Sequence, residues 1–261
     1  MMDLNFQKNS IEELQQLANS DRHSILIEGP SGCGKSYLAR YFGKMKNITD
    51  ILFIKPNVQD LRDALDMSYN LTSPILFCVE NLDLGVPSAS YTLLKFLEEP
   101  TKNVYIIVTC RNRFGVPDTI ISRCTCISVP SPVESDINVY AEHTDATKYA
   151  TLKNIPVWKG VKGLTDVDYV YKMKSEHIDY FRDTKSILNM KDSISTMSWK
   201  IGHYPDNSEA NVPFVLNYLI GVTKNKRVQN YLIQCIRELS TSRIAQHAVL
   251  AKFLFDLKYG V

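Results

Sequence analysis

Short apolar runs alternate with helically patterned segments through the first half of the chain. The runs at residues 74–80 and 103–110 are almost wholly apolar, which is typical of parallel strands covered on both faces. The segments between such runs carry apolar residues at helical spacing. Strands that alternate with helices predict an α/β fold with a parallel sheet. The expected strands are residues 24–29, 51–56, 74–80, 103–110 and 125–130, and the expected helices are residues 11–20, 58–70 and 88–99 and one that opens with 37–42.

The pattern changes after Pro130. Strand-like runs become rare, and residues 135–198 predict several short helices, broken near Pro156. A polar break follows at residues 202–211. From Val212 onward, three segments carry apolar residues at positions i, i+3 and i+4, which predicts a helical C-terminal unit. The chain is therefore expected to contain three domains, an α/β core followed by two helical domains, at residues 1–130, 131–200 and 201–261.

Composition adds few constraints. The chain is 44% hydrophobic, as globular proteins are, and its net charge of +2 is too small to indicate nucleic-acid binding by itself. The six cysteines form no C-x2-C pair, so no zinc site is expected. No stretch approaches the roughly 20 apolar residues of a membrane helix. With reduced thiols and no secretory signal, the chain is expected to be cytoplasmic and to have no membrane partner.

The octet GPSGCGKS at residues 29–36 fits the pattern G-x-x-x-x-G-K-[ST] between an expected strand and an expected helix. Its glycines let backbone N–H groups turn toward phosphates, and the following helix adds its positive N-terminal end. Lys35 is expected to reach the β- and γ-phosphates, and the Ser36 hydroxyl to ligate Mg²⁺. We therefore predict a nucleoside-triphosphate site formed by Gly29, Pro30, Ser31, Gly32, Cys33, Gly34, Lys35, Ser36 and Tyr37.

Two other protein classes carry nearly the same octet. ABC transporter ATPases also need an LSGGQ-like segment before their second acidic motif, and this sequence has none. Guanylate kinases share GPSGxGKS but lack two strings that are present here, LLKFLEEP at residues 93–100 and SRC at residues 122–124. A small-molecule kinase is therefore the less favoured alternative.

A second acidic motif, ENLD at residues 80–83, ends the third expected strand, where P-loop ATPases place the acid of the Mg²⁺ shell. From this point to PDTIISRC at residues 117–124, the chain resembles the clamp-loader branch of the AAA+ ATPases. Its LLKFLEEP string is close to that of the bacterial gamma and delta-prime subunits of DNA polymerase III. The resemblance is strong over residues 20–128. It implies a RecA-like AAA+ core, a small helical lid and a helical collar for the three expected domains.

The resemblance also implies residue roles. Glu80 stands where the family places its Mg²⁺-linked aspartate, so Ser36 and Glu80 are expected to hold Mg²⁺ directly or through water. Asn81 stands where the family places its catalytic glutamate, and an amide cannot accept a proton from water, which puts hydrolysis in question. Asp83 is either a substitute carboxylate or a helix cap. Arg123 resembles the arginine finger that reaches the γ-phosphate of a neighbouring subunit's ATP.

Two sensor positions complete the comparison with the family. A polar residue is expected at the end of the fourth strand, and Thr109 and Asn112 suit that role better than Arg111, which an ungapped count gives. DTKSILN at residues 183–189 resembles the D-x-R-x-A-L-N pattern of the family's lid. Lys185 would then replace an arginine that senses the γ-phosphate, keeping the charge but not the bidentate fork.

The implied function is an ATP- and Mg²⁺-dependent ATPase that opens a sliding clamp and loads it on primer-template DNA. The partners would be the clamp, the DNA and other loader subunits, in a homo- or hetero-oligomer that is expected to be pentameric. The alternative is a non-hydrolysing, delta-prime-like subunit that binds ATP and donates Arg123. Candidate DNA contacts are Lys44, Lys46, Arg62, Arg113, Lys224, Lys226 and Arg227.

One departure from the cellular subunits concerns zinc. Those subunits carry a four-cysteine zinc module between the P-loop and the second acidic motif, and residues 37–79 contain no such set of cysteines. The short chain without this module resembles a minimal loader subunit of a large tailed bacteriophage. In that case the protein would act in the host cytoplasm.

Overall fold

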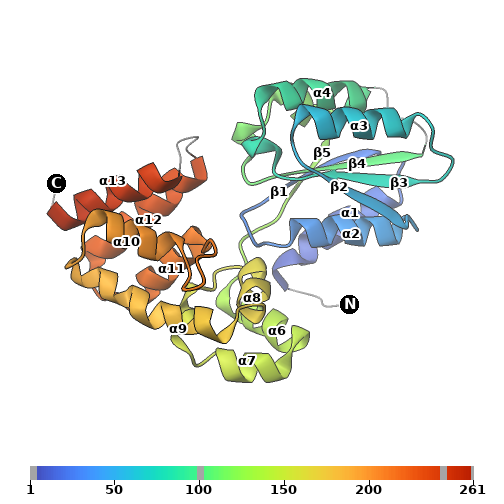
Figure 1. Ribbon diagram of the computed structural model, residues 1–261. Coiled ribbons are helices and arrows are strands. Elements are labelled where there is room, and N and C mark those ends of the chain that lie inside the picture. The colour runs from blue at the N-terminus through green and yellow to red at the C-terminus, as the bar shows by residue number, and fades with distance from the viewer. Residues whose placement is uncertain (1–4, 99–102, 242–245, 260–261) are drawn as a thin grey trace. The chain divides into compact units, whose positions relative to one another are not determined.

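The computed structural model describes residues 5–98, 103–241 and 246–259, and it divides the chain into two compact units (Figure 1). Unit 1 is Met1–Asp136 and unit 2 is Ile137–Val261. One hydrophobic cluster extends through unit 2, from Ile137 to Leu254. The division of the helical region into a lid at residues 131–200 and a collar at residues 201–261 stays a prediction.

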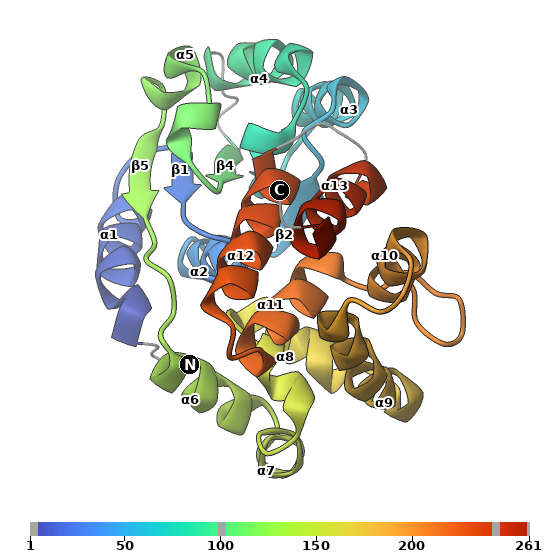
Figure 2. The same cartoon turned by 90° about the vertical axis from the view of Figure 1, so that its left-hand side faces the viewer.

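A single parallel sheet forms the centre of unit 1 and confirms the expected α/β class. The strands follow the order β2-β3-β4-β1-β5, and each neighbouring pair is parallel. In Figure 2, β5, β1 and β4 lie side by side in that order. The strands are β1 (Ser24–Glu28), β2 (Asp50–Ile54), β3 (Ile75–Val79), β4 (Val104–Cys110) and β5 (Thr125–Ser128).

Helices cover both faces of this sheet, which explains why its central strands are apolar throughout. Helices α1 (Lys8–Ala18) and α2 (Lys35–Met45) cover one face, and α3 (Val58–Ser68) and α4 (Pro87–Glu98) cover the other (Figure 1). Successive strand residues alternate between the two cores. In β1, Ile25 and Ile27 pack in the cluster that contains Phe42 of α2, whereas Leu26 packs in the cluster that contains Phe96 of α4.

The expected elements of unit 1 are all present, with shifted ends. Helix α2 begins at Lys35 rather than Tyr37, because Gly34 is its N-cap. Helix α4 ends at Glu98, and Glu99 and Pro100 of the LLKFLEEP string lie outside the described residues. Four short helical segments were not predicted: η1 (Asn5–Gln7), η2 (Leu82–Leu84), η3 (Arg113–Gly115) and α5 (Asp118–Ile121).

The regular structure in the described residues of unit 2 is helical, as expected, apart from one isolated bridge between His203 and Glu209. Its core is rich in aromatic side chains, and the Phe181 ring makes edge contacts with those of Phe214 and Tyr218. No described helix of either unit is long and apolar enough to cross a membrane. The helices from the unit boundary onward are α6 (Glu134–Thr144), α7 (Ala146–Leu152), η4 (Pro156–Gly160), α8 (Leu164–Tyr171), α9 (Ser175–Thr184), η5 (Lys185–Asn189), α10 (Ile194–Gly202), α11 (Val212–Val222), α12 (Lys226–Thr241) and α13 (Gln246–Tyr259).

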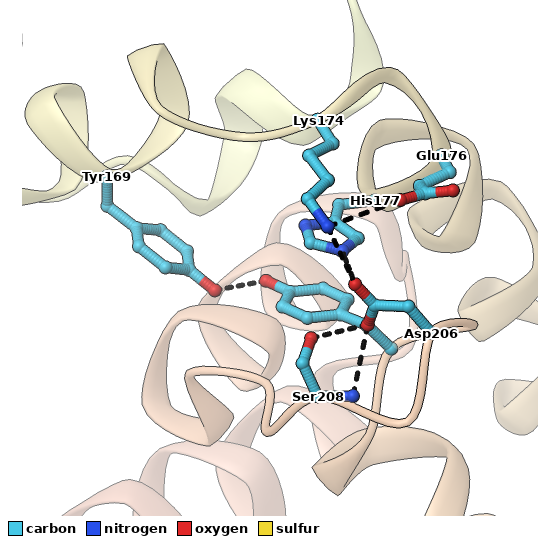
Figure 3. Close-up of polar contacts among 7 residues, drawn as sticks. Tyr169, Lys174, Glu176, His177, Asp206 and Ser208 are labelled. Atoms are coloured by element: carbon cyan, nitrogen blue, oxygen red, sulfur yellow. Dashed lines mark hydrogen bonds and ion pairs between the residues drawn. The ribbon is translucent and has the colours of Figure 1, made fainter.

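A polar cluster attaches the segment between α10 and α11 to the start of α9 (Figure 3). One Asp206 carboxylate oxygen lies 3.0 Å from Lys174 Nζ and 3.1 Å from His177 Nε2. The other accepts hydrogen bonds from the backbone N–H and the hydroxyl of Ser208. The His177 ring stacks on Tyr204 with 4.2 Å between ring centroids. Because Lys174 already supplies a cation to this carboxylate, the cluster has a structural explanation within the chain.

The first prediction concerns the packing of η4 against α11. A Cβ added to Gly160 would lie 2.8 Å from Cζ of the buried Phe214 ring. Gly160→Ala should therefore lower the free energy of unfolding by about 1–3 kcal/mol, as overpacking does. Gly202→Ala is the matched control, since its nearest atom would be 3.7 Å away, at ordinary contact distance. Urea denaturation checks both variants, and equal losses would contradict the packing argument.

The second prediction concerns Asp206 and pH. Hydrogen bonds from Ser208, followed by those from Lys174 and His177, hold the pKa of the Asp206 carboxyl well below its usual range. A lowered pKa contributes stability above the unfolded value of about 3.9, and that contribution is lost as the pH falls through the folded value. Asp206→Asn should therefore lower the melting temperature at pH 7, with a difference from wild type that shrinks below about pH 4. A difference independent of pH between 7 and 3 would refute this assignment.

Candidate nucleotide-binding site

The predicted site residues of unit 1 gather at one edge of the sheet. The P-loop follows β1, Glu80 follows β3, and Thr109 is the next-to-last residue of β4. These three strands are neighbours in the order β3-β4-β1 and run parallel. Their carboxyl ends therefore meet at the same edge, which is where open α/β sheets bind their ligands.

The backbone of the P-loop requires its glycines. Gly32 and Gly34 have φ angles of 79° and 86°, in the left-handed region that favours glycine. A Cβ on Gly29 would lie 2.6 Å from the Val129 carbonyl oxygen and 2.7 Å from Cys33 Sγ. The loop therefore combines left-handed turns with a close approach to the residue that follows β5, and it leads directly into the N-terminus of α2. This local geometry suits an anion.

Lys35 is held inside the loop. Its ammonium donates hydrogen bonds to the Gly29 and Pro30 carbonyl oxygens, at 2.6 and 2.8 Å, and the residue is only 7% exposed. Burial lowers the pKa of Lys35, and interactions with Cys33 and Asp83 partly oppose that shift. A cation with little access to solvent, bound by carbonyl groups, is a group that a phosphate can pair with at small desolvation cost. The predicted role of Lys35 fits this placement.

Ser36 and Glu80 are brought together as the Mg²⁺ prediction requires. The Ser36 hydroxyl donates a hydrogen bond of 2.7 Å to Glu80 Oε1, across the gap between α2 and the end of β3. Hydroxyl and carboxylate oxygens are ligands that Mg²⁺ prefers. The extra methylene of Glu80, compared with aspartate, therefore does not prevent its carboxylate from reaching Ser36. These two residues fit a Mg²⁺ ion.

Asn81 has a backbone reason to be asparagine. Its φ and ψ are 51° and 54°, in the left-handed region, where asparagine is among the best tolerated of the non-glycine residues. Its backbone N–H donates to the hydroxyl of Thr109 at 2.9 Å, and Thr109 is only 2% exposed. The structure thus brings Thr109 next to the acidic motif, whereas Asn112 caps η3 and accepts from Phe114 N–H instead.

Two carboxylates tie the strand ends to the segment after β4. Asp83 lies within η2, so it is not a helix cap, and it accepts the Arg111 backbone N–H at 3.1 Å. Glu28, at the end of β1, accepts the backbone N–H of Arg113 and pairs with its guanidinium at 2.7 Å. Sequence reasoning missed Glu28, although an acid directly before a P-loop was a visible signal. Arg113, a candidate DNA contact, therefore already has an acidic partner within the chain.

Gln7 is a second residue that the sequence pattern did not reveal. It is fully buried, and its side-chain amide donates to the Cys33 carbonyl oxygen of the P-loop at 2.6 Å. Among the described residues, the Gln7 Oε1 atom is the buried side-chain oxygen that has no hydrogen-bond partner. The N-terminal segment therefore supports the P-loop from a position that is distant in sequence.

Two of the remaining predicted residues, Arg123 and Tyr37, lie at the surface of unit 1. Arg123 follows α5 at the surface, and its guanidinium donates to the Thr119 carbonyl oxygen and pairs with Glu98. Tyr37 is exposed in the first turn of α2. Lys185 is exposed at the start of η5 in unit 2, and its sensor role stays a prediction.

Comparison with protein families gives two partial matches. The family described as DNA polymerase III, delta subunit, matches residues 54–132, and the sigma-54 interaction domain family matches residues 3–80. The DNA polymerase III subunit tau of Bacillus subtilis (strain 168) is 25% identical over an alignment that covers 39% of this chain. That alignment covers 23% of the tau subunit, so this chain matches less than a quarter of its relative.

Solved structures of similar fold cover nearly the whole chain. A gamma subunit-related DNA polymerase III protein from Thermotoga maritima has a TM-score of 0.50 at 17% identity, over 95% of this chain and 98% of that protein. The RuvB Holliday junction branch migration motor of Thermotoga maritima has a TM-score of 0.53 at 12% identity, over 96% and 82%. At such identities the likeness concerns the fold, which is that of AAA+ proteins. The two DNA polymerase III matches and this fold agree with the resemblance to the clamp-loader ATPases that the sequence motifs carry.

Proposed function

We propose that this chain is an ATP-binding and ATP-hydrolysing subunit of a sliding-clamp loader. The observation that carries the proposal is the 2.7 Å hydrogen bond between Ser36 and Glu80 beside a P-loop with a buried lysine, in a chain that matches DNA polymerase III subunits. P-loop NTPases need a hydroxyl and a carboxylate on the same Mg²⁺ ion next to the loop lysine. A small-molecule kinase would not account for the DNA polymerase III matches.

The roles of the residues follow from their chemistry. Backbone N–H groups of the P-loop and the Lys35 ammonium would bind the phosphates of ATP, and Ser36 and Glu80 would hold Mg²⁺. The metal, when bound, would neutralise charge on the phosphate oxygens. Thr109, through its hydrogen bond to the Asn81 backbone, would keep the acidic motif in register with the end of β4. Lys185 is proposed as a γ-phosphate sensor from the lid.

The proposal implies an oligomer, because Arg123 would act at the ATP of a neighbouring subunit. Such fingers contribute about 10³–10⁵ in rate in related enzymes. The proposed partners are a sliding clamp, primer-template DNA and other loader subunits in a pentameric assembly.

DNA would be held through its phosphates. Among the basic candidates, Lys46 already donates to the Ser20 carbonyl oxygen and lies over the Tyr105 ring, and Arg227 lies over the Tyr231 ring. Lys44, Arg62, Lys224 and Lys226 are therefore the better candidates.

One observation favours a second function, that of a subunit that binds ATP without hydrolysing it. Asn81 has no proton-accepting group, and its left-handed backbone would strain a glutamate at that position by roughly 1–2 kcal/mol. Such a subunit would still donate Arg123 to its neighbour. The two functions differ only in whether ATP bound by this chain is turned over.

The third prediction tests ATP binding. Lys35→Ala removes the buried ammonium, so ATP affinity and turnover by the assembly with clamp and primed DNA should fall to background, while the variant stays folded. Lys95→Ala, at an exposed position of α4, is the control and should behave as wild type. Titration with a fluorescent ATP analogue and steady-state phosphate release provide the measurements. Unchanged ATP affinity in Lys35→Ala would refute the site.

The fourth prediction tests the role of Asn81. A positioned general base contributes about 10²–10⁴ to rate, so Asn81→Glu should raise turnover by at least about tenfold after part of that gain is lost to backbone strain. Asn81→Gln has the same length and the same strain but accepts no proton, so it should show no gain. Single-turnover ATP hydrolysis in the assembled complex compares the three proteins. Equal rates for the Glu and Gln variants would show that position 81 does not hold the base.

A further inference from the structure

The exposed acid of the LLKFLEEP string has a specific partner. Within this string, Leu93, Phe96 and Leu97 are buried in the core beneath α4, while Glu98 is exposed at the end of the helix. Glu98 Oε1 lies 2.7 Å from Nη2 of Arg123. The burial of the apolar positions explains why they are apolar, but it gives no reason for an acid at position 98. The contact with Arg123 supplies that reason.

Both ends of this pair are anchored by the core. Ile120 of α5 is fully buried in the same hydrophobic cluster as Phe96 and Leu97, so α4 and α5 are packed together. The Arg123 backbone N–H donates to the Ile120 carbonyl oxygen at 3.1 Å. The backbones of Glu98 and Arg123 are therefore held at a set separation by apolar packing, and the ion pair bridges it.

The guanidinium has two fixed contacts and spare donors. Its Nη1 donates to the Thr119 carbonyl oxygen at 2.8 Å, and its Nη2 donates to Glu98 at 2.7 Å. A guanidinium carries five N–H donors in a rigid fork, so these two contacts orient the fork without using all of its donors. The Arg123 side chain is 37% exposed, so an anion can approach it.

We propose that Glu98 is a positioning residue, which holds the Arg123 guanidinium in the orientation that the triphosphate of a neighbouring subunit requires. This inference rests on the proposed function, in which Arg123 acts in trans. An arginine has a long side chain with high rotamer entropy, and a contact made beforehand reduces what must be ordered when the anion binds. Small misplacements of catalytic groups cost up to about 10²-fold in rate. By contrast, an exposed ion pair contributes little to stability.

The fifth prediction is a double-mutant cycle on the assembled complex with clamp and primed DNA. Glu98→Gln should lower kcat by about 10- to 100-fold while the affinity for ATP and the melting temperature stay as in wild type. In an Arg123→Ala background, Glu98→Gln should cause no further loss, because there is no guanidinium left to orient. Asp118→Asn is the matched control, since it removes an exposed acid of α5 and should leave kcat unchanged.

A second measurement examines the restraint directly and does not need turnover. Nitrogen-15 NMR of the Arg123 guanidinium should show slow rotation of its Nη groups in the wild-type protein and faster rotation in Glu98→Gln. Equal rotation in the two proteins would overturn the proposal, as would an increase in kcat for Glu98→Gln or a full loss in the Arg123→Ala background. If Arg123→Ala itself leaves turnover unchanged, the proposed function of Arg123 fails, and the rotation measurement still decides whether Glu98 orients it.

Discussion

Parallel pairing of β3, β4 and β1 is the constraint on which the nucleotide site depends. The pairing places the ends of these strands at one edge, so residues separated by tens of positions in sequence meet there. Ser36 and Glu80 come within hydrogen-bond distance, and the Thr109 hydroxyl holds the backbone after β3. A shift of one residue in register would turn every side chain of the shifted strand to the opposite face. The apolar faces covered by helices on both sides oppose such a shift.

The site balances local strain against chemistry. The P-loop buries the Lys35 ammonium among carbonyl groups, and the burial of this charge weakens the isolated fold. An anion with bound Mg²⁺ would reverse the electrostatic part of this cost. At position 81 the backbone is favoured over the chemistry. Asparagine suits the left-handed backbone there, but its side chain cannot accept a proton. In the proposed function, this site would bind a triphosphate, and the residue at position 81 would govern whether the triphosphate is hydrolysed.

Two glutamates of unit 1 each form an ion pair with an arginine, and the two pairs differ in their contacts. Glu28 takes both the backbone and the guanidinium of Arg113, so that arginine closes the segment after β4 onto the end of β1. Glu98 contacts Arg123 through one terminal nitrogen, and the Arg123 side chain stays 37% exposed. The first pairing links two segments of the fold, the end of β1 and the segment after β4. In our proposal, the second pairing orients an arginine at the surface so that it can act on a neighbouring subunit.

The sequence by itself determined the element types and the phosphate loop, because apolar periodicity and glycine positions reflect forces that act over a few residues. It predicted five strands in parallel and located Lys35, Ser36 and Glu80. It did not reveal the amide of Gln7 beneath Cys33, the tie between Glu28 and Arg113, or the partner of Glu98. Each of these joins residues far apart in sequence. Only the tertiary structure decides such contacts, since strand order and helix packing set which distant side chains meet, and no local pattern encodes that choice.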